Sequence, residues 1–175
     1  MANRIFADQG DILIDGLPAK ENMAVHEKIF CMSDQNLYDS TLKIRDIFKW
    51  TDRFCCPLDK AFRIVEMFSL DTRKRFPALS KGQQSIFKLT IALALDTPYV
   101  IFDEPVLGLD ANHRELFYHL LLQDYEENQR TIILATHLIE EASNVIGRDE
   151  LGTMKLISLA QGRPCPRAVR CRSPV

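Results

Sequence analysis

Short apolar runs alternate with helix-like patterns along most of the chain. Alternating apolar and polar positions over Gly10–Gly16 predict a short strand that ends in a turn, and Lys28–Met32 is expected to form a second strand. The near-continuous apolar runs at Val100–Phe102 and Thr131–Ala135 predict strands that are buried on both faces. Since helical patterns separate these strands, we expect an α/β fold built around a mainly parallel sheet.

Helical periodicity is found in three parts of the sequence. It runs from Leu42 to Leu70, which places a helical block inside the strand-bearing frame. A second helix is expected to begin at Ser80, because Ser80 and Gln83 fit the S-x-x-Q capping box, and to run to about Leu95. The third is expected after Asp110, whose carboxylate suits a helix N-cap.

The composition is that of an ordinary globular protein, and its net charge does not indicate a particular kind of partner. A chain of 175 residues suits one domain with a substantial core, and 46% hydrophobic with 26% charged residues is ordinary for such a domain. The formal net charge of -2 supplies no basic field, so we expect no nucleic-acid partner. No stretch approaches the roughly 18 apolar residues of a membrane span, so a membrane link is expected only through a partner.

The cysteines indicate a reducing compartment. They show no paired C-x-x-C spacing, and an odd number of cysteines cannot all pair within one chain. We therefore expect reduced thiols in the cytosol. The cysteines are Cys31, Cys55, Cys56, Cys165 and Cys171.

The last part of the sequence differs from the rest. Residues 147–175 are basic, rich in proline and without periodicity, which predicts a disordered tail. The ordered domain is then expected over residues 1–146, with its helical subdomain at about 38–95.

Two adjacent acids follow the buried strand in "VIFDEP". Asp103 and Glu104 should lie beyond the carboxyl end of that strand, where open α/β sheets bind their ligands. Such a pair can divide the work, one acid holding Mg²⁺ and the other orienting and deprotonating a water molecule. A pair of acids alone is more typical of a solvated turn than of a catalytic site, so the neighbouring motifs decide between the two interpretations.

Four motifs in register resemble those of the ABC ATPase family. The signature motif corresponds to "LSKGQ" (Leu79–Gln83), Walker B to "VIFDEP" (Val100–Pro105), the D-loop to "LGLD" (Leu107–Asp110) and the switch histidine to "ATH" (Ala135–His137). The resemblance covers roughly residues 10–145. It implies a P-loop NTPase-like core with a mainly parallel sheet and a helical signature subdomain, incomplete at both ends.

The resemblance also implies a role for each motif. The signature residues Ser80, Lys81, Gly82 and Gln83 would face the γ-phosphate of ATP held by the opposite subunit, although Lys81 replaces the usual glycine. Asp103 would hold Mg²⁺ and Glu104 would act as the general base. His137 would contact the γ-phosphate, and Asp110 would cap its helix and contact the partner subunit. The glutamine of the Q-loop corresponds to Asp34 or Gln35, of which Gln35 is favoured.

The sequence contains no G-x-x-x-x-G-K-[ST], the loop that cradles phosphate in this family. The first residues look like the end of the helix that follows that loop. We therefore expect a chain that begins just downstream of the P-loop and is inactive alone.

The function implied is that of a partial ATP-binding and ATP-hydrolysing subunit of an ABC transporter. Binding and hydrolysis of MgATP would occur in a head-to-tail dimer with a second ATP-binding subunit. A separate transmembrane permease subunit would hold this dimer at the cytoplasmic face of the membrane, and an exporter type is favoured.

Two alternative functions stay open. One is a non-enzymatic, degenerate fragment that at most docks onto a partner, and the other is a non-transporter ABC ATPase of DNA repair or translation.

Overall fold

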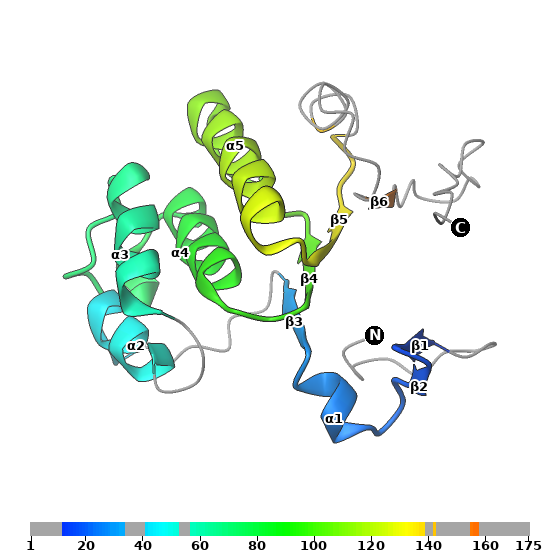
Figure 1. Ribbon diagram of the computed structural model, residues 1–175. Coiled ribbons are helices and arrows are strands. Elements are labelled where there is room, and N and C mark those ends of the chain that lie inside the picture. The colour runs from blue at the N-terminus through cyan, green and yellow to red at the C-terminus, as the bar shows by residue number, and fades with distance from the viewer. Residues whose placement is uncertain (1–11, 34–40, 53–56, 139–141, 143–154, 158–175) are drawn as a thin grey trace.

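The structure is a computed structural model that describes residues 12–33, 41–52, 57–138, 142 and 155–157. The elements follow the chain in the order β1, β2, α1, β3, α2, α3, α4, β4, α5, β5 and β6, so the helices α2 to α4 lie in sequence between β3 and β4 (Figure 1). The strands are β1 (Leu13–Ile14), β2 (Leu17–Pro18), β3 (Ile29–Met32), β4 (Tyr99–Asp103), β5 (Thr131–Ala135) and β6 (Lys155–Ile157). The helices are α1 (Met23–His26), α2 (Ile44–Thr51), α3 (Leu58–Met67), α4 (Lys81–Ala94) and α5 (Ala111–Asn128).

The central sheet is parallel, as the buried apolar runs predict. Its strand order is β3-β4-β5-β6, and every neighbouring pair is parallel. Val100, Phe102, Ile132 and Leu134 alternate along β4 and β5, so they share one face of the sheet, and all four are buried. The residues between them, Ile101 and Ile133, are only partly buried, so burial on both faces, which the apolar runs predict, is not complete. The short pair β1–β2 is antiparallel and forms a separate hairpin, with Asp15 and Gly16 at its turn in the left-handed region.

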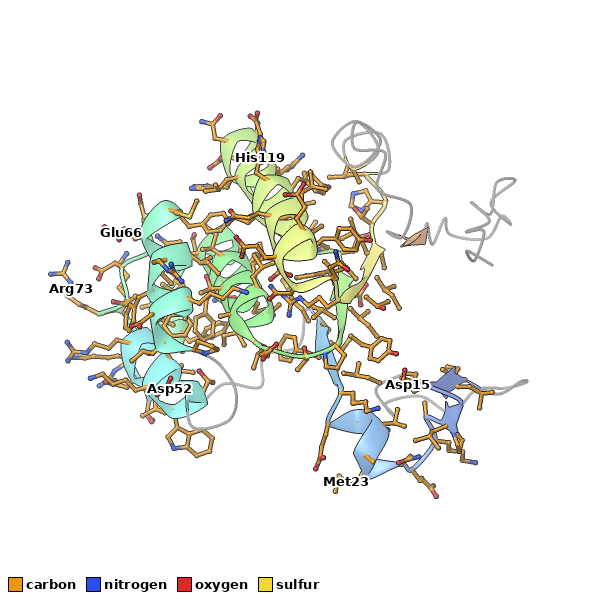
Figure 2. All side chains as sticks on the ribbon, viewed as in Figure 1. Asp15, Met23, Asp52, Glu66, Arg73 and His119 are labelled. Carbon is orange, nitrogen blue, oxygen red and sulfur yellow. The ribbon has the colours of Figure 1, made fainter. Side chains whose placement is uncertain are left out.

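A helical block stands beside the sheet, and α4 joins the two. In Figure 1, α2, α3, α4 and α5 lie on one side of the strands, and α4 contacts α3, α5 and β3. Glu66, Arg73 and His119 extend outward from this block (Figure 2). A chain of ring contacts fills its interior, including Phe48 with Phe87 at 5.2 Å and Phe76 with Phe87 at 5.4 Å between centroids.

A buried arginine ties the end of α4 to α5. Arg130 is 6% exposed, and its Nε donates to Oδ2 of Asp124 on α5 at 2.5 Å. Its other nitrogens donate to carbonyl oxygens at the end of α4, including Leu95 at 2.6 Å. Because the last carbonyls of a helix have no intrahelical partner, this side chain serves as a C-terminal cap supplied from outside the helix.

The predicted elements are confirmed where the structure describes them. One described strand, β6, is not among the predicted elements. The capping box at Ser80, the helix after Asp110 and the strands at residues 28–32, 100–102 and 131–135 are all present. Within residues 147–175, for which the composition predicts a disordered tail, the part described is Lys155–Ile157. These three residues form β6 against β5. The rest of the segment lies outside the described residues, so the tail stays a prediction.

Candidate functional site

The register of the sheet brings three strand ends to one edge. Met32 of β3 pairs with Phe102 of β4, and Phe102 pairs with Leu134 of β5. The residues that follow these strands therefore leave the sheet side by side. They are Ser33 after β3, Glu104 after β4 and Thr136 after β5. The acid pair therefore lies at the carboxyl edge of the sheet, the edge at which open α/β sheets bind their ligands.

Glu104 and His137 are in direct contact. The carboxylate of Glu104 accepts a hydrogen bond from the backbone N–H of His137 at 3.1 Å, and its Oε2 lies 2.9 Å from Nδ1 of His137. Because an ionised carboxylate only accepts hydrogen bonds, Nδ1 is assigned as the protonated nitrogen. Two residues given separate roles by the motifs thus form one hydrogen-bonded pair.

The backbone around Glu104 is held in an uncommon conformation. Its φ is 48°, in the left-handed region, which is costly for a residue with a side chain. The N–H of Glu104 donates to the carbonyl of Ala135 at 2.9 Å, so the turn is fixed to the end of β5. Strain of this kind persists only where the surroundings impose it, and it is concentrated at functional sites.

Asp103 is the last residue of β4 and is exposed. Across the described parts of the chain, no group of three or more His, Cys, Asp or Glu side chains forms a protein cage for an ion. Mg²⁺ does not require one, because it is usually bound by one or two carboxylates together with water and phosphate oxygens. An exposed aspartate at a strand end beside a cavity therefore fits a Mg²⁺ site that is shared with a ligand.

A cavity of about 230 Å³ opens beside the acid pair. One wall comes from α4 and the other from the ends of β3 and β4 and the loop after β4. The polar residues and the glycine that line it are Ser33, Lys81, Gln84, Ser85, Lys88, Asp103, Glu104 and Gly108. Cationic and anionic side chains therefore border the same space.

The signature residues form the capped start of α4. The Oγ of Ser80 accepts from the N–H of Gln83 at 3.2 Å, and the side chain of Gln83 accepts from the N–H of Ser80 at 3.2 Å. Ser80 and Lys81 are exposed at this helix start. The reciprocal pair stabilises the helix end, and a contact with ATP of an opposite subunit stays a prediction.

Gly82 is required by a close contact inside the chain. A Cβ built on Gly82 would lie 2.5 Å from the carbonyl oxygen of Gly108, a distance that real Cβ atoms do not adopt. Gly108 itself has a φ of 81°, which favours glycine. Ser85 adds a hydrogen bond to the carbonyl of Leu107 at 2.9 Å. The signature helix and the D-loop segment are therefore packed together.

Asp110 caps α5, as the sequence predicts. Its Oδ1 accepts from the N–H of His113 at 2.9 Å, and its Oδ2 lies 2.8 Å from Nδ1 of the same residue. The hydrogen bond from the backbone N–H of His113 is the main reason that the pKa of Asp110 is lowered. Asp110 stays exposed, and a contact with a partner subunit is a prediction.

Two features belong to the end of β3. One is the predicted Q-loop, and the other is a contact from Lys88, a residue that the motifs do not predict. Asp34 and Gln35 lie outside the described residues. Lys88, which the motifs do not single out, is buried on α4, and its Nζ donates to the carbonyl of Ser33 at 3.1 Å. The sequence feature that could have indicated this residue is the presence of a lysine inside the apolar run of α4.

Comparison with known families assigns the chain. A family model described as "AAA domain, putative AbiEii toxin, Type IV TA system" matches residues 37–143, more than half of the chain. The chain belongs to this AAA-domain family. The match covers the signature, Walker B, D-loop and switch-histidine motifs, so the residues of these four motifs lie within the matched domain.

Curated relatives of this AAA domain are ATP-binding proteins of ABC transporters. The "ABC transporter ATP-binding protein YtrB" of Bacillus subtilis is 25% identical over 82% of this chain and 50% of its own length. The "Osmoprotectant import ATP-binding protein OsmV" of Salmonella typhimurium is 28% identical over 99% of this chain and 46% of its own length. The chain spans about half the length of these relatives. They confirm the resemblance to ABC transporter ATP-binding subunits, and they do not favour the exporter type.

Solved structures confirm the fold of this AAA domain. The "Dimeric Structure of MJ0796, a Bacterial ABC Transporter Cassette" superposes with a TM-score of 0.68 at 22% identity and covers 87% of this chain and 69% of that one. A related structure of MJ0796 is described as "bound to ADP and Pi". At this level of identity the likeness shows the P-loop NTPase-like α/β fold alone. None of the described helices of this chain is both long and apolar enough to cross a bilayer.

Proposed function

We propose that this chain forms part of an ATP-hydrolysing subunit of an ABC transporter. The observation that carries the proposal is the Glu104–His137 pair beside Asp103 at the carboxyl edge of the parallel sheet. A carboxylate held in a strained turn and bonded by a histidine suits a base that must meet one water molecule in one geometry. The ATP-binding names of the relatives support the choice of ATP as the ligand.

In this proposal each residue has a distinct task. Asp103 holds Mg²⁺, which would neutralise charge on the phosphate oxygens. Glu104 orients the attacking water and accepts its proton, and His137 holds the carboxylate of Glu104 while it contacts the terminal phosphate. The signature segment from Ser80 to Gln83 presents the start of α4 to the nucleotide of a second ATP-binding subunit.

The proposal includes partners and a location. A head-to-tail dimer of ATP-binding subunits would contact a transmembrane permease subunit, which would hold it at the inner face of the membrane. Since residues 1–175 contain no G-x-x-x-x-G-K-[ST], the phosphate cradle must come from another polypeptide segment. The chain alone is therefore expected to have no ATPase activity.

Hydrolysis by a fused protein tests the catalytic assignment. A P-loop strand and helix from a related subunit would be joined ahead of Met1, and MgATP binding and turnover would be measured separately. Glu104→Gln should keep MgATP affinity and lower turnover by about 100-fold or more, because the amide cannot accept a proton. Asp103→Asn should instead weaken the Mg²⁺ dependence of binding as well as turnover.

The matched control is Glu115→Gln, which makes the same change at an exposed position of α5. It should leave turnover unchanged. Hydrolysis by Glu104→Gln at the parent rate would refute the role of Glu104. If no fused protein hydrolyses ATP, the non-enzymatic docking alternative becomes the better explanation.

A further inference from the structure

Six cationic side chains lie on two adjacent segments of the helical block. The segments are residues 43–50, which include most of α2, and residues 71–75. The N–H of Ile44 donates to the carbonyl of Lys74 at 2.9 Å, which joins them. Arg73 extends outward from the block (Figure 2). All six side chains are exposed, and together they are called the basic patch: Lys43, Arg45, Lys49, Arg73, Lys74 and Arg75.

The basic patch carries more positive charge than its own acids neutralise. Two acids lie in the same two segments, and each is next to an arginine. Oδ1 of Asp46 lies 3.7 Å from Nε of Arg45, and Oδ1 of Asp71 lies 2.9 Å from Nε of Arg73. Among the described residues, no salt bridge holds any of the other four cations of the patch. Since the whole chain has a net charge of -2, positive charge is concentrated at this surface.

An exposed tryptophan adjoins the basic patch. Trp50 of α2 is the single tryptophan of the chain and is 62% exposed, which gives up the free energy of burying an indole. Leu42, just before α2, is also exposed. The opposite side of α2 is buried at Ile44, Ile47 and Phe48. The helix therefore presents cations and an indole on its solvent side.

A bilayer surface with anionic lipids fits this combination. Lysine and arginine side chains bind lipid phosphates without a fixed geometry, so cations spread over two segments can all contribute. An indole is stabilised at the boundary between headgroups and acyl chains, because its ring is apolar and its N–H can donate. Lys49 and Asp52 flank Trp50 in the sequence and are exposed, whereas charge is depleted from the core of protein–protein interfaces. A bilayer is therefore a better fit than a folded acidic partner.

We propose that the basic patch and Trp50 bind the surface of an anionic bilayer directly. This contact goes beyond the proposed function, since it adds to the location through a permease and does not depend on ATP hydrolysis. α2 lies along the headgroups, with Trp50 at the boundary to the acyl chains and the buried side of the helix still packed on the helical block. No residue of the basic patch lines the cavity beside Asp103, so lipid and a ligand of that cavity use different side chains.

Vesicle titrations of the purified 175-residue chain test this proposal, with the fluorescence emission of Trp50 as the readout. Because the chain has one tryptophan, a shift of the emission reports on this surface. We expect a saturable blue shift with phosphatidylcholine vesicles that contain about 30% phosphatidylglycerol, and none with pure phosphatidylcholine. Raising NaCl from about 0.1 M to about 1 M should reverse the shift, because the Debye length falls from about 10 Å to about 3 Å.

Neutralising two lysines of the patch should weaken the binding. Lys43→Gln/Lys74→Gln should raise the apparent dissociation constant about 30-fold, because each basic residue near an anionic leaflet contributes about fivefold. Lys43 makes no capping hydrogen bond with its side chain, although it is the N-cap of α2, so α2 should persist. Lys43→Arg/Lys74→Arg should bind as the parent chain does, because it keeps both charges.

The matched control is Lys20→Gln/Arg63→Gln, which removes two charges from exposed positions outside the basic patch. It should bind vesicles as the parent chain does. Circular dichroism would check that each variant is folded. If Lys43→Gln/Lys74→Gln did not fold, Lys49→Gln/Arg75→Gln would replace it.

Four results would overturn the proposal. Three of them are no blue shift with phosphatidylglycerol vesicles, equal binding to pure phosphatidylcholine, and parent-like binding by a folded patch variant. The fourth comes from polyglutamate added without vesicles, which should give no blue shift. The same shift with this peptide would assign the surface to an acidic protein partner instead. Since no nucleotide is present, these outcomes are separate from that of the Glu104→Gln experiment.

Discussion

Arg130→Met should strongly destabilise the chain. Arg130 is 6% exposed, and its guanidinium donates to Asp124 and to carbonyls at the end of α4. Methionine preserves most of the apolar contact and removes every one of these donors. The carboxylate of Asp124, whose side chain is 4% exposed, then loses its closest partner.

The expected loss in the free energy of unfolding comes from the buried groups that Arg130 leaves without a partner. Removing one partner of a buried ion pair costs about 3–5 kcal/mol, because the other charge is left in a poorly solvated place. Asp124 keeps Lys60 Nζ at 2.9 Å and Asn128 Nδ2 at 2.9 Å, which favours the lower half of that range. The carbonyls at the end of α4 lose their donor at the same time, which raises the cost again. We therefore expect about 3–5 kcal/mol, or a Tm lower by about 6–20 °C.

Urea denaturation and thermal melts would measure the loss. Arg73→Met is the matched control, because Arg73 pairs with Asp71 at 2.9 Å but its side chain is 79% exposed. An exposed pair of this kind contributes little to stability because water and salt screen it, so the control should melt close to the parent chain. The double variant Arg130→Met/Asp124→Leu should recover much of the loss, since no unpaired buried charge is left between these positions. An Arg130→Met chain that is as stable as Arg73→Met would refute the reasoning.

Two further predictions concern the site itself. Gly82→Ala should cost about 1–3 kcal/mol in urea denaturation through overpacking, because the new Cβ would lie 2.5 Å from the carbonyl of Gly108; an unchanged midpoint would mean that the loop moves at no cost. The pKa of Asp110 is lowered by the backbone N–H of His113, so its stabilising contribution is present above the unfolded pKa of about 3.9 and is lost as the pH falls through the folded value. The stability advantage of the parent chain over Asp110→Asn should accordingly shrink as the pH falls from 5 to 3, and an advantage that stays constant over this range would contradict the assignment.

Local patterns predicted the elements and the caps well. Each of these features depends on neighbouring residues, as in the reciprocal bonds of Ser80 with Gln83 and the bond from the N–H of His113 to Asp110. The apolar runs of β4 and β5 predict these two parallel strands correctly, but only the face with Val100, Phe102, Ile132 and Leu134 is fully buried. The order of the motifs also predicts that Asp103, Glu104 and His137 belong to one site.

Contacts between distant segments were not readable in the same way. The Glu104–His137 pair depends on the register of β4 with β5 and on the left-handed turn at Glu104. Glutamate does not favour the left-handed region of φ, so the sequence at this position does not predict such a turn. Lys88 was overlooked because one lysine in an apolar helix is usually a surface residue, and only the packing of α4 against the sheet buries it.

The packing of Gly82 against Gly108 has a consequence for protein engineering. Two motifs that are far apart in the sequence share one contact surface, which the hydrogen bond from Ser85 to Leu107 extends. A chimera that exchanges only the signature segment would match a foreign helix to the resident D-loop. Any larger side chain or altered loop conformation on either side would then clash at this point. Segments 79–85 and 107–110 should therefore be exchanged together, as a single module.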